Sequence, residues 1–181
     1  IETAMAAIGA GWAVGLDWLV IRAGVSSCVS DAQTAPGRFN LFNYRNATLI
    51  ADYGHNPDAI QALVSAINNI PSKKRSVVIS AAGDRRDEDI RQQTRILGDA
   101  FDEVVLYQDK CQRGRADGEV LTLLREGLGN AKRTQKVSEI VGEDIAIDAA
   151  LSNLKDGELC LILVDQVEQS LGQINNRIAL G

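Results

Sequence analysis

The sequence predicts an α/β fold, a Rossmann-like and mostly parallel sheet with helices on both faces, preceded by a short helical remnant. From residue 39 to residue 178, short apolar runs of strand length alternate with longer segments of helical character. Several of the apolar runs are continuous, which is typical of strands buried on both faces of a parallel sheet. Because strand–helix–strand crossovers are right-handed, this alternation favours a single layered sheet.

The first segment, residues 1 to about 25, is rich in Ala, Leu and Ile and is predicted to be helical. Three glycines weaken or break that helix, and a fourth is a candidate C-cap. These residues are Gly9, Gly11 and Gly15, and then Gly24.

A linker is predicted over residues 26–37, which are polar and end with Pro36-Gly37. We therefore expect residues 1–34 to form a helical tail plus linker and residues 35–181 to form the main domain. The chain begins at an isoleucine, so we expect it to be a piece of a longer protein.

Two short strands, 39–44 and 47–53, are predicted around a hairpin turn at Arg45-Asn46. Asn56 is expected to cap the next helix, with Pro57 at its first position. Further strands are predicted at 76–82, 103–107, 137–140 and 158–164. Helices are predicted at 88–101, 118–128, 144–154 and 166–178.

Charge and cysteine usage exclude several classes of function. The net charge is −5 with both signs interspersed, so we expect neither a nucleic-acid-binding face nor a polybasic membrane anchor. No apolar run is long enough to span a bilayer. Cys28, Cys111 and Cys160 are odd in number and far apart, so we expect reduced thiols in a cytoplasmic protein.

Three polar loops, 53–58, 83–87 and 108–117, follow three of the predicted strands. Ligands of open α/β sheets bind beyond the carboxyl ends of the strands, so we expect these loops to share one edge. The first loop holds the only histidine, His55. An imidazole there can stack on a base or hydrogen-bond a ribose or phosphate. The alternative is an efficient helix start with His55 as a solvated residue, and spacing alone favours it.

The second and third loops are rich in charge. The second carries Asp84 and Arg85 directly before a helix, where an arginine can bind a phosphate or a charged amino acid. In the third, Gly114 leaves two flanking arginines able to converge on an anion, and nearby carboxylates can hold a cationic substrate. The candidates are Asp109, Arg113, Arg115, Asp117 and Glu119. The alternative for both loops is a solvated surface with local ion pairs.

Some motifs are absent from the sequence. There is neither a GxxxxGK[ST] loop nor a GxGxxG after a strand, so the chain lacks a recognisable phosphate cradle of its own. No cluster of His and Cys has the spacing of a transition-metal site. Arg38 follows Pro36-Gly37, and composition alone favours a solvated side chain there.

Three motifs, in their order, resemble the C-terminal domain of the Mur ligase superfamily over roughly residues 36–165. They are Pro36-Gly37-Arg38-Phe39, Asp52-Tyr53-Gly54-His55-Asn56-Pro57-Asp58 and Gly83-Asp84-Arg85-Arg86-Asp87. The residues before them resemble the last helices of the family's central ATPase domain. The stretch 83–90 and Arg113-Gly114-Arg115 are similar to the cyanophycin synthetase branch. Two stretches typical of muramyl ligases, Asp-Asn-Pro in the third loop and Gly-Lys-Gly after the last main strand, are absent.

The resemblance implies an ATP-dependent amide ligase. Such ligases use ATP and Mg²⁺ to convert a carboxylate into an acyl phosphate, which an amine then attacks. In the family the P-loop and the metal ligands belong to the central domain, and the C-terminal domain closes over the nucleotide. The resemblance therefore implies that this chain alone is inactive, and that closure protects the acyl phosphate from water.

The resemblance also implies roles for single residues. Arg38 would contact the phosphates or ribose of ATP, Asp52 would accept from the ribose, and His55 with Asn56 would line the adenosine side. The amine-substrate pocket would be shaped by Asp84, Arg85, Asp109, Arg113, Arg115, Asp117 and Glu119. In the cyanophycin synthetase branch the amine substrate is arginine, added to aspartate side chains of an acidic polymer.

Two alternatives stay open. One is a muramyl peptide ligase or another Mur-type amino-acid ligase. The other is a non-catalytic module that binds a nucleotide or an amino acid. The sequence is compatible with an oligomer and does not define one.

Overall fold

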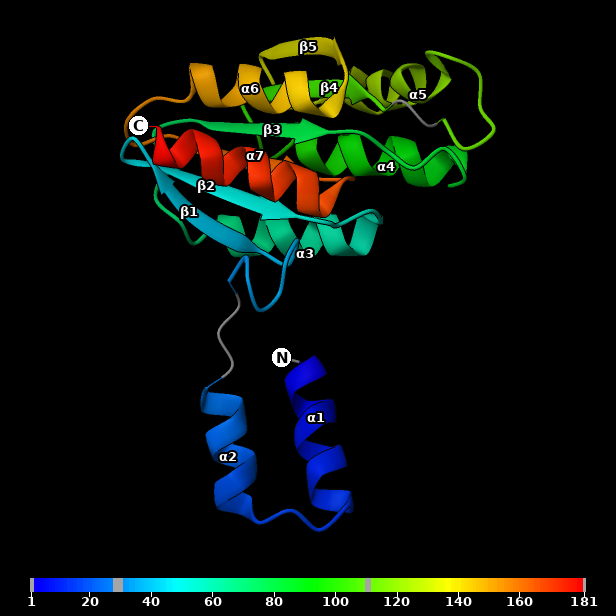
Figure 1. Ribbon diagram of the computed structural model, residues 1–181. Helices are drawn as coiled ribbons and strands as arrows, with labels where there is room; N and C mark the ends of the chain where they lie inside the picture. Colours follow the sequence, from blue (N-terminus) through cyan, green and yellow to red (C-terminus); the bar gives the residue numbers. More distant parts are fainter. Residues whose placement is uncertain (1, 28–30, 110–111, 181) are drawn as a thin grey trace. The chain divides into compact units, whose positions relative to one another are not determined.

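Figure 1 shows the computed structural model, which describes residues 2–27, 31–109 and 112–180. The chain divides into two compact units, Ile1–Ser30 and Asp31–Gly181. The boundary expected from the sequence, between residues 34 and 35, lies a few residues further along the same linker.

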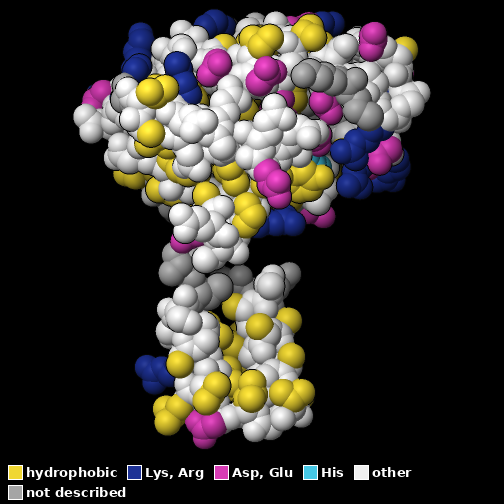
Figure 2. Space-filling model, in the orientation of Figure 1, with side chains coloured by type: hydrophobic (Ala, Val, Ile, Leu, Met, Phe, Trp, Pro, Cys, Tyr) yellow, Lys and Arg dark blue, Asp and Glu magenta, His cyan; other side chains and the backbone are white. Residues whose placement is uncertain are grey.

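The first unit consists of two helices, α1 (Glu2–Ala13) and α2 (Trp18–Ser26). The carboxylate of Asp17 begins α2 by accepting a hydrogen bond from the backbone N–H of Leu19 at 2.8 Å. Gly24 lies inside α2, whose C-cap is Ser27, so its prediction as a C-cap is wrong. Many large apolar side chains of this unit are exposed, as Figure 2 shows. They are Met5, Trp12, Val14, Leu16, Trp18, Leu19, Val20 and Val25.

The second unit is built on a six-stranded sheet of order β1-β2-β6-β3-β4-β5. Only β1 is antiparallel to its neighbour, and the other pairs are parallel. The strands are β1 (Asn40–Tyr44), β2 (Ala47–Asp52), β3 (Arg75–Ile79), β4 (Glu103–Gln108), β5 (Lys136–Val141) and β6 (Leu159–Leu163). Arg45 and Asn46 have φ of 52° and 59°, which is the left-handed backbone that a two-residue hairpin turn requires.

Helices cover both faces of the sheet (Figure 1). One face packs against α3 (Pro57–Ile67), α4 (Asp87–Gly98), α5 (Glu119–Gly127) and the short 3-10 helix η1 (Leu128–Asn130). The other face packs against α6 (Glu143–Asn153) and α7 (Val167–Ala179). Each layer has its own apolar core, and β2, β3, β4 and β6 contribute side chains to both. The predicted fold class is confirmed.

The sheet order determines where a ligand can bind. Strand β6 lies between β2 and β3, so the last strand of the sequence occupies the middle of the sheet. The carboxyl ends of β2, β6, β3 and β4 therefore succeed one another along a single edge. Ligands of such sheets bind at that edge.

Cys160 lies on β6 and is fully buried, and burial raises the pKa of its thiol to about 11. A thiol of that kind is inert at neutral pH. Cys28 and Cys111 lie outside the described residues, and the cytoplasmic location expected from the three cysteines stays a prediction. In the described ranges no helix is both long and apolar enough to cross a membrane.

Candidate functional site

The structure brings the three predicted loops together at the carboxyl edge of the sheet. Arg113 in the third loop lies 3.7 Å from the carboxylate of Asp84 in the second loop. His55 in the first loop lies 3.6 Å from Asp165, which follows β6. Asp165 is not among the site residues predicted from the sequence. The signal was present, because Asp165 follows a buried apolar strand at the same edge.

The side chain of His55 is mostly buried, with 10% of it exposed, so the alternative of a solvated loop residue is wrong. Its ring meets that of Tyr53 edge to face, with the two ring centroids 4.2 Å apart. Burial lowers the pKa of His55; Asp165 opposes this shift, and Arg113, Arg85 and Arg38 reinforce it. The imidazole is therefore neutral at neutral pH, so one ring nitrogen can donate and the other can accept a hydrogen bond.

Asp165 connects His55 to Arg113. Its Oδ1 atom lies 3.6 Å from Nε2 of His55 and 3.4 Å from Nη2 of Arg113. The Asp165 side chain is 11% exposed, so solvent screens these interactions less than at the open surface. One carboxylate thus faces an imidazole and a guanidinium that come from two different loops.

Several buried polar atoms around His55 have no hydrogen-bond partner among the described residues. They are both ring nitrogens of His55, Oγ of Ser80 and Oε1 of Gln93. A narrow crevice, which we call the His55 crevice, lies beside His55 and Ser80 near the carboxyl ends of β4 and β6. It is lined by His55, Ser80, Ala81, Ala82, Tyr107, Asp109, Arg113 and Asp165. Buried polar atoms in proteins are nearly always hydrogen-bonded, so these atoms are hydrogen-bonding capacity that the described residues do not use.

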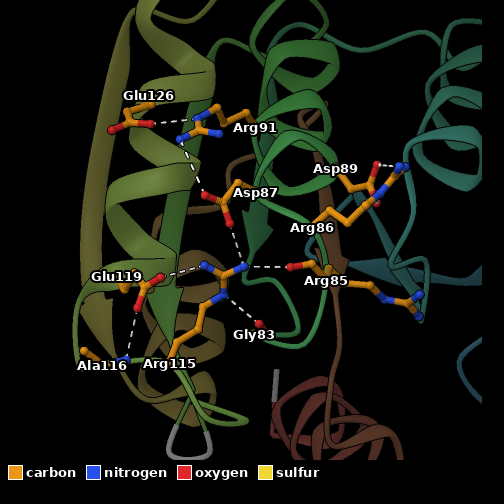
Figure 3. A network of polar contacts seen from close by, with 10 residues as sticks. All are labelled: Gly83, Arg85, Arg86, Asp87, Asp89, Arg91, Arg115, Ala116, Glu119 and Glu126. Atoms are coloured by element: carbon orange, nitrogen blue, oxygen red, sulfur yellow. Dashed lines mark hydrogen bonds and ion pairs between the residues drawn. The ribbon is translucent and has the colours of Figure 1, made fainter.

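Arg115 has a different environment, shown in Figure 3. Its Nε donates to the carbonyl of Gly83 at 2.6 Å, and Nη1 donates to Glu119 at 2.6 Å. Its Nη2 donates to the carbonyl of Arg85 at 2.7 Å and to Asp87 at 2.8 Å. The second oxygen of Glu119 accepts from the backbone N–H of Ala116 at 3.2 Å. Arg115 and these partners form the loop clamp, which holds the second and third loops together.

The loop clamp depends on a close approach of two backbones. A Cβ atom on Gly83 would overlap the carbonyl oxygen of Gln112 in the third loop. Arg113 and Gly114 have φ of 48° and 91°, and the left-handed turn sends Arg113 toward Asp165 and Arg115 toward Gly83. The two guanidinium groups therefore do not converge on one anion, which was one of the possibilities that the sequence left open.

Asp52, Asn56 and Arg38 lie at the first loop and the turn before β1. The carboxylate of Asp52 is buried and accepts from the backbone N–H of Phe39 at 2.7 Å, so it supports the turn that carries Arg38. Burial raises the pKa of Asp52, against the hydrogen bond from Phe39 and the charge of Arg38. Asn56 caps α3 by accepting from Ala59 at 2.8 Å, as predicted, with Pro57 at the first helical position. The nucleotide contacts expected of these residues stay predictions.

The other candidate residues lie on the surface of the second and third loops. Asp84, Arg85 and Asp117 are exposed, whereas Asp109 is half-buried beside the crevice. Their contacts with an amine substrate stay predictions. Within the described ranges, no group of three or more His, Cys, Asp or Glu side chains is arranged to hold a metal ion.

The family model described as the Mur ligase glutamate ligase domain matches residues 37–163. The chain belongs to the Mur ligase family. It is 32% identical to cyanophycin synthetase from Synechocystis sp. over 100% of this chain and 21% of that protein. It is 28% identical to UDP-N-acetylmuramoyl-L-alanyl-D-glutamate–2,6-diaminopimelate ligase from Alkaliphilus metalliredigens, over 88% of this chain and 31% of that ligase. The chain thus spans about a fifth to a third of the relatives it matches.

Solved structures share the fold. E. coli FolC in complex with ADP superimposes with a TM-score of 0.68 at 23% identity, over 92% of this chain and 36% of FolC. A bifunctional folylpolyglutamate synthase/dihydrofolate synthase from Yersinia pestis, complexed with AMPPNP and Mn ion, gives a TM-score of 0.67 at 20% identity. That match covers 89% of this chain and 35% of the synthase.

Proposed function

We propose that this chain is the nucleotide-closing and amine-substrate-binding domain of an ATP-dependent amide ligase of the cyanophycin synthetase type. The reaction joins arginine to aspartate side chains of an acidic polymer through an acyl phosphate. The observation that carries the proposal is the His55 crevice, where unpartnered buried polar atoms lie at the carboxyl edge of the sheet. The similarity to cyanophycin synthetases over the whole chain supports the choice of branch.

The charged groups around the crevice suit a nucleotide bound beside it. Arg38, Arg85 and Arg113 all lie near enough to His55 to lower its pKa, while the carboxylate of Asp165 acts in the opposite direction. The three guanidinium groups suit phosphates, and the neutral imidazole can hydrogen-bond a ribose or a base. We assign phosphate or ribose contacts to Arg38 and the adenosine side to His55 and Asn56. The resemblance implied the amine pocket for Arg113, and we propose the nucleotide side instead, because Arg113 pairs with Asp165 beside His55. Asp52 acts by holding the turn at Phe39, with a ribose contact as its second role.

In the proposed reaction ATP would supply the phosphoryl group, and Mg²⁺ would neutralise its charge. We propose that the P-loop and the metal ligands lie in another part of the parent protein, because this chain has no phosphate cradle of its own. What this chain contributes is closure, which excludes water from the acyl phosphate.

The amine substrate is proposed to lie beside the second and third loops. Asp109 and Asp117 can accept hydrogen bonds from the guanidinium group of arginine, and Asp84 and Arg85 border the same surface. Arg115 and Glu119 are already paired with each other and with backbone groups. We therefore propose that these two shape the pocket by holding the loops, and that a direct contact would require them to exchange partners.

The first unit is proposed to be the tail of the central ATPase domain. Its two helices expose large apolar side chains, including Trp12 and Trp18 at 75% and 59% exposure. A two-helix unit of this size buries too little surface to be stable alone, and an apolar patch of this kind marks an interface. We propose that the rest of that ATPase domain packs against these exposed apolar side chains.

The test is ATP consumption by the full-length parent with arginine and an aspartate-containing primer, run against a panel of muramyl substrates. We expect arginine-dependent turnover, and no turnover by the 181-residue chain alone. His55→Ala and Arg38→Ala should raise the KM for ATP while the domain stays folded. Turnover with a muramyl substrate instead of arginine would contradict the proposed branch. Unchanged ATP kinetics in both variants would contradict the nucleotide contacts.

A further inference from the structure

Glu143, the first residue of α6, is a buried carboxylate with three hydrogen bonds. It is 7% exposed and follows Gly142, whose φ of 101° belongs to the left-handed region. Its Oε1 accepts from the backbone N–H of Asp165 at 2.9 Å and from the hydroxyl of Ser170 at 2.7 Å. Its Oε2 accepts from the backbone N–H of Gln166 at 3.1 Å.

These bonds fix the turn between β6 and α7. The N-cap of α7 is Gln166, whose side chain makes no capping hydrogen bond. A carboxylate from a different helix accepts instead from the backbone N–H of the N-cap residue, Gln166, and from that of Asp165 before it. Hydrogen bonds to a carboxylate are stronger than those between neutral groups, so the turn is held firmly.

The same turn carries Asp165. Its backbone is bound to Glu143, while its side chain faces His55 at 3.6 Å and Arg113 at 3.4 Å. A displacement of the turn would therefore separate a carboxylate from both an imidazole and a guanidinium.

We propose that Glu143 is a positioning residue that acts through Asp165. Its carboxylate holds the turn at Asp165 and Gln166, and the turn places the Asp165 carboxylate between His55 and Arg113. The consequence for ATP rests on the proposed function, whereas the positioning itself does not.

The position of the Asp165 carboxylate can be followed through the pKa of His55, which is the single histidine of the chain. Asp165 raises the pKa of His55 against the effect of burial, so withdrawing Asp165 should lower that pKa further. The experiment is an NMR titration of the His55 ring in the 181-residue chain. Asp165→Asn removes the Asp165 charge and should lower the pKa of His55, and this decrease is the reference for the other variants. Glu143→Gln and Glu143→Asp should shift the pKa in the same direction.

Glu143→Asp separates position from charge, because aspartate keeps the negative charge and is too short to hold both backbone amides. The matched control is Asp144→Asn, which removes an exposed charge one residue away and should leave the pKa of His55 unchanged. If the Glu143 variants titrate like the wild type while Asp165→Asn shifts, the proposal is wrong. If the Glu143 variants do not fold, Ser170→Ala tests the proposal instead, because it removes only one of the three hydrogen bonds to Glu143. We expect a smaller downward shift from Ser170→Ala, and an unchanged pKa would contradict the proposal.

A second measurement connects the positioning to ATP. In the full-length parent, Glu143→Gln should raise the KM for ATP about tenfold, the factor that corresponds to one lost charge-assisted hydrogen bond. A His55 shift without any change in KM would contradict the nucleotide site and leave the positioning intact. A changed KM without a His55 shift would contradict the positioning by Glu143.

Discussion

The loop clamp and the His55 crevice lie at the same edge of one sheet and use their polar groups in opposite ways. In the loop clamp, each guanidinium nitrogen of Arg115 donates to a carbonyl or a carboxylate. In the crevice, His55 and Ser80 keep buried polar atoms without a hydrogen-bond partner in the described part of the chain. Saturated polar groups hold a structure together, and unsaturated ones are available to a ligand.

The difference between the two regions shows that the charge of a loop residue does not by itself indicate whether that residue binds a ligand. Arg113 and Arg115 stand two positions apart and look equivalent in the sequence. The structure assigns Arg115 to the clamp and Arg113 to the side of the crevice. Substitutions in the clamp should therefore reduce stability first, and those in the crevice should reduce function first.

The largest effect is expected from Gly83→Ala. The added methyl group would overlap the backbone of Gln112, so the second and third loops would have to separate. We expect a loss of at least about 3 kcal/mol in the free energy of unfolding, measured by urea denaturation. Gly129→Ala is the control, because a Cβ at Gly129 meets nothing within 4 Å, and it should change stability by less than about 0.5 kcal/mol. Equal stabilities of the two variants would show that the loops do not need this contact.

Arg115→Ala should have the second largest effect. It leaves Glu119, Asp87 and two backbone carbonyls without their donor, so we expect a loss of about 2 kcal/mol in the free energy of unfolding. The control is Arg86→Ala, because the Arg86 side chain is 84% exposed and pairs with Asp89. That variant should cost less than about 0.5 kcal/mol. Similar losses for both would mean that the clamp is no stronger than a surface ion pair.

A smaller effect is expected from the protonation of His55. Burial lowers its pKa in the folded chain below the ordinary value of 6.5, so below pH 6.5 the unfolded chain binds a proton that the folded chain does not. Stability is therefore lost as the pH falls from 6.5 toward the folded pKa, by at most about 1.4 kcal/mol per pH unit. His55→Gln should remove this contribution. The stability difference between wild type and variant, measured at pH 7.5 and pH 5.5, should shift in favour of the variant at the lower pH. A difference that stays constant would mean that His55 is not buried as a neutral ring.

Much of the fold follows from local signals in the sequence. The cap at Asn56-Pro57, the turn at Arg45-Asn46 and the alternating apolar runs each specify one element within a few residues. The edge that carries the site follows from the alternation alone, because parallel strands end on the same side. The break between α1 and α2 contains Gly15, one of the glycines expected to weaken or break the helix, and Asp17 then caps the new helix.

The site itself was less predictable, since it depends on tertiary contacts. His55 occurs in a polar loop, and its burial results from Tyr53, Asp165 and Arg113, of which two are distant in sequence. The roles of Arg113 and Arg115 depend on backbone angles at Arg113 and Gly114 that composition does not specify. Glu143 and Asp165 stand at the ends of unremarkable segments, and only the sheet order places them together.

The most direct test compares Arg113→Gln with Arg115→Gln in two measurements. The first is the free energy of unfolding of the 181-residue chain, and the second is the KM for ATP of the full-length parent. Arg113→Gln should change stability by less than about 1 kcal/mol and raise the KM about tenfold or more. Arg115→Gln should lower stability by about 2 kcal/mol and change the KM by less than about threefold. The reverse pattern, or the same pattern for both variants, would contradict the division between a clamp that holds the loops and a crevice that binds the nucleotide.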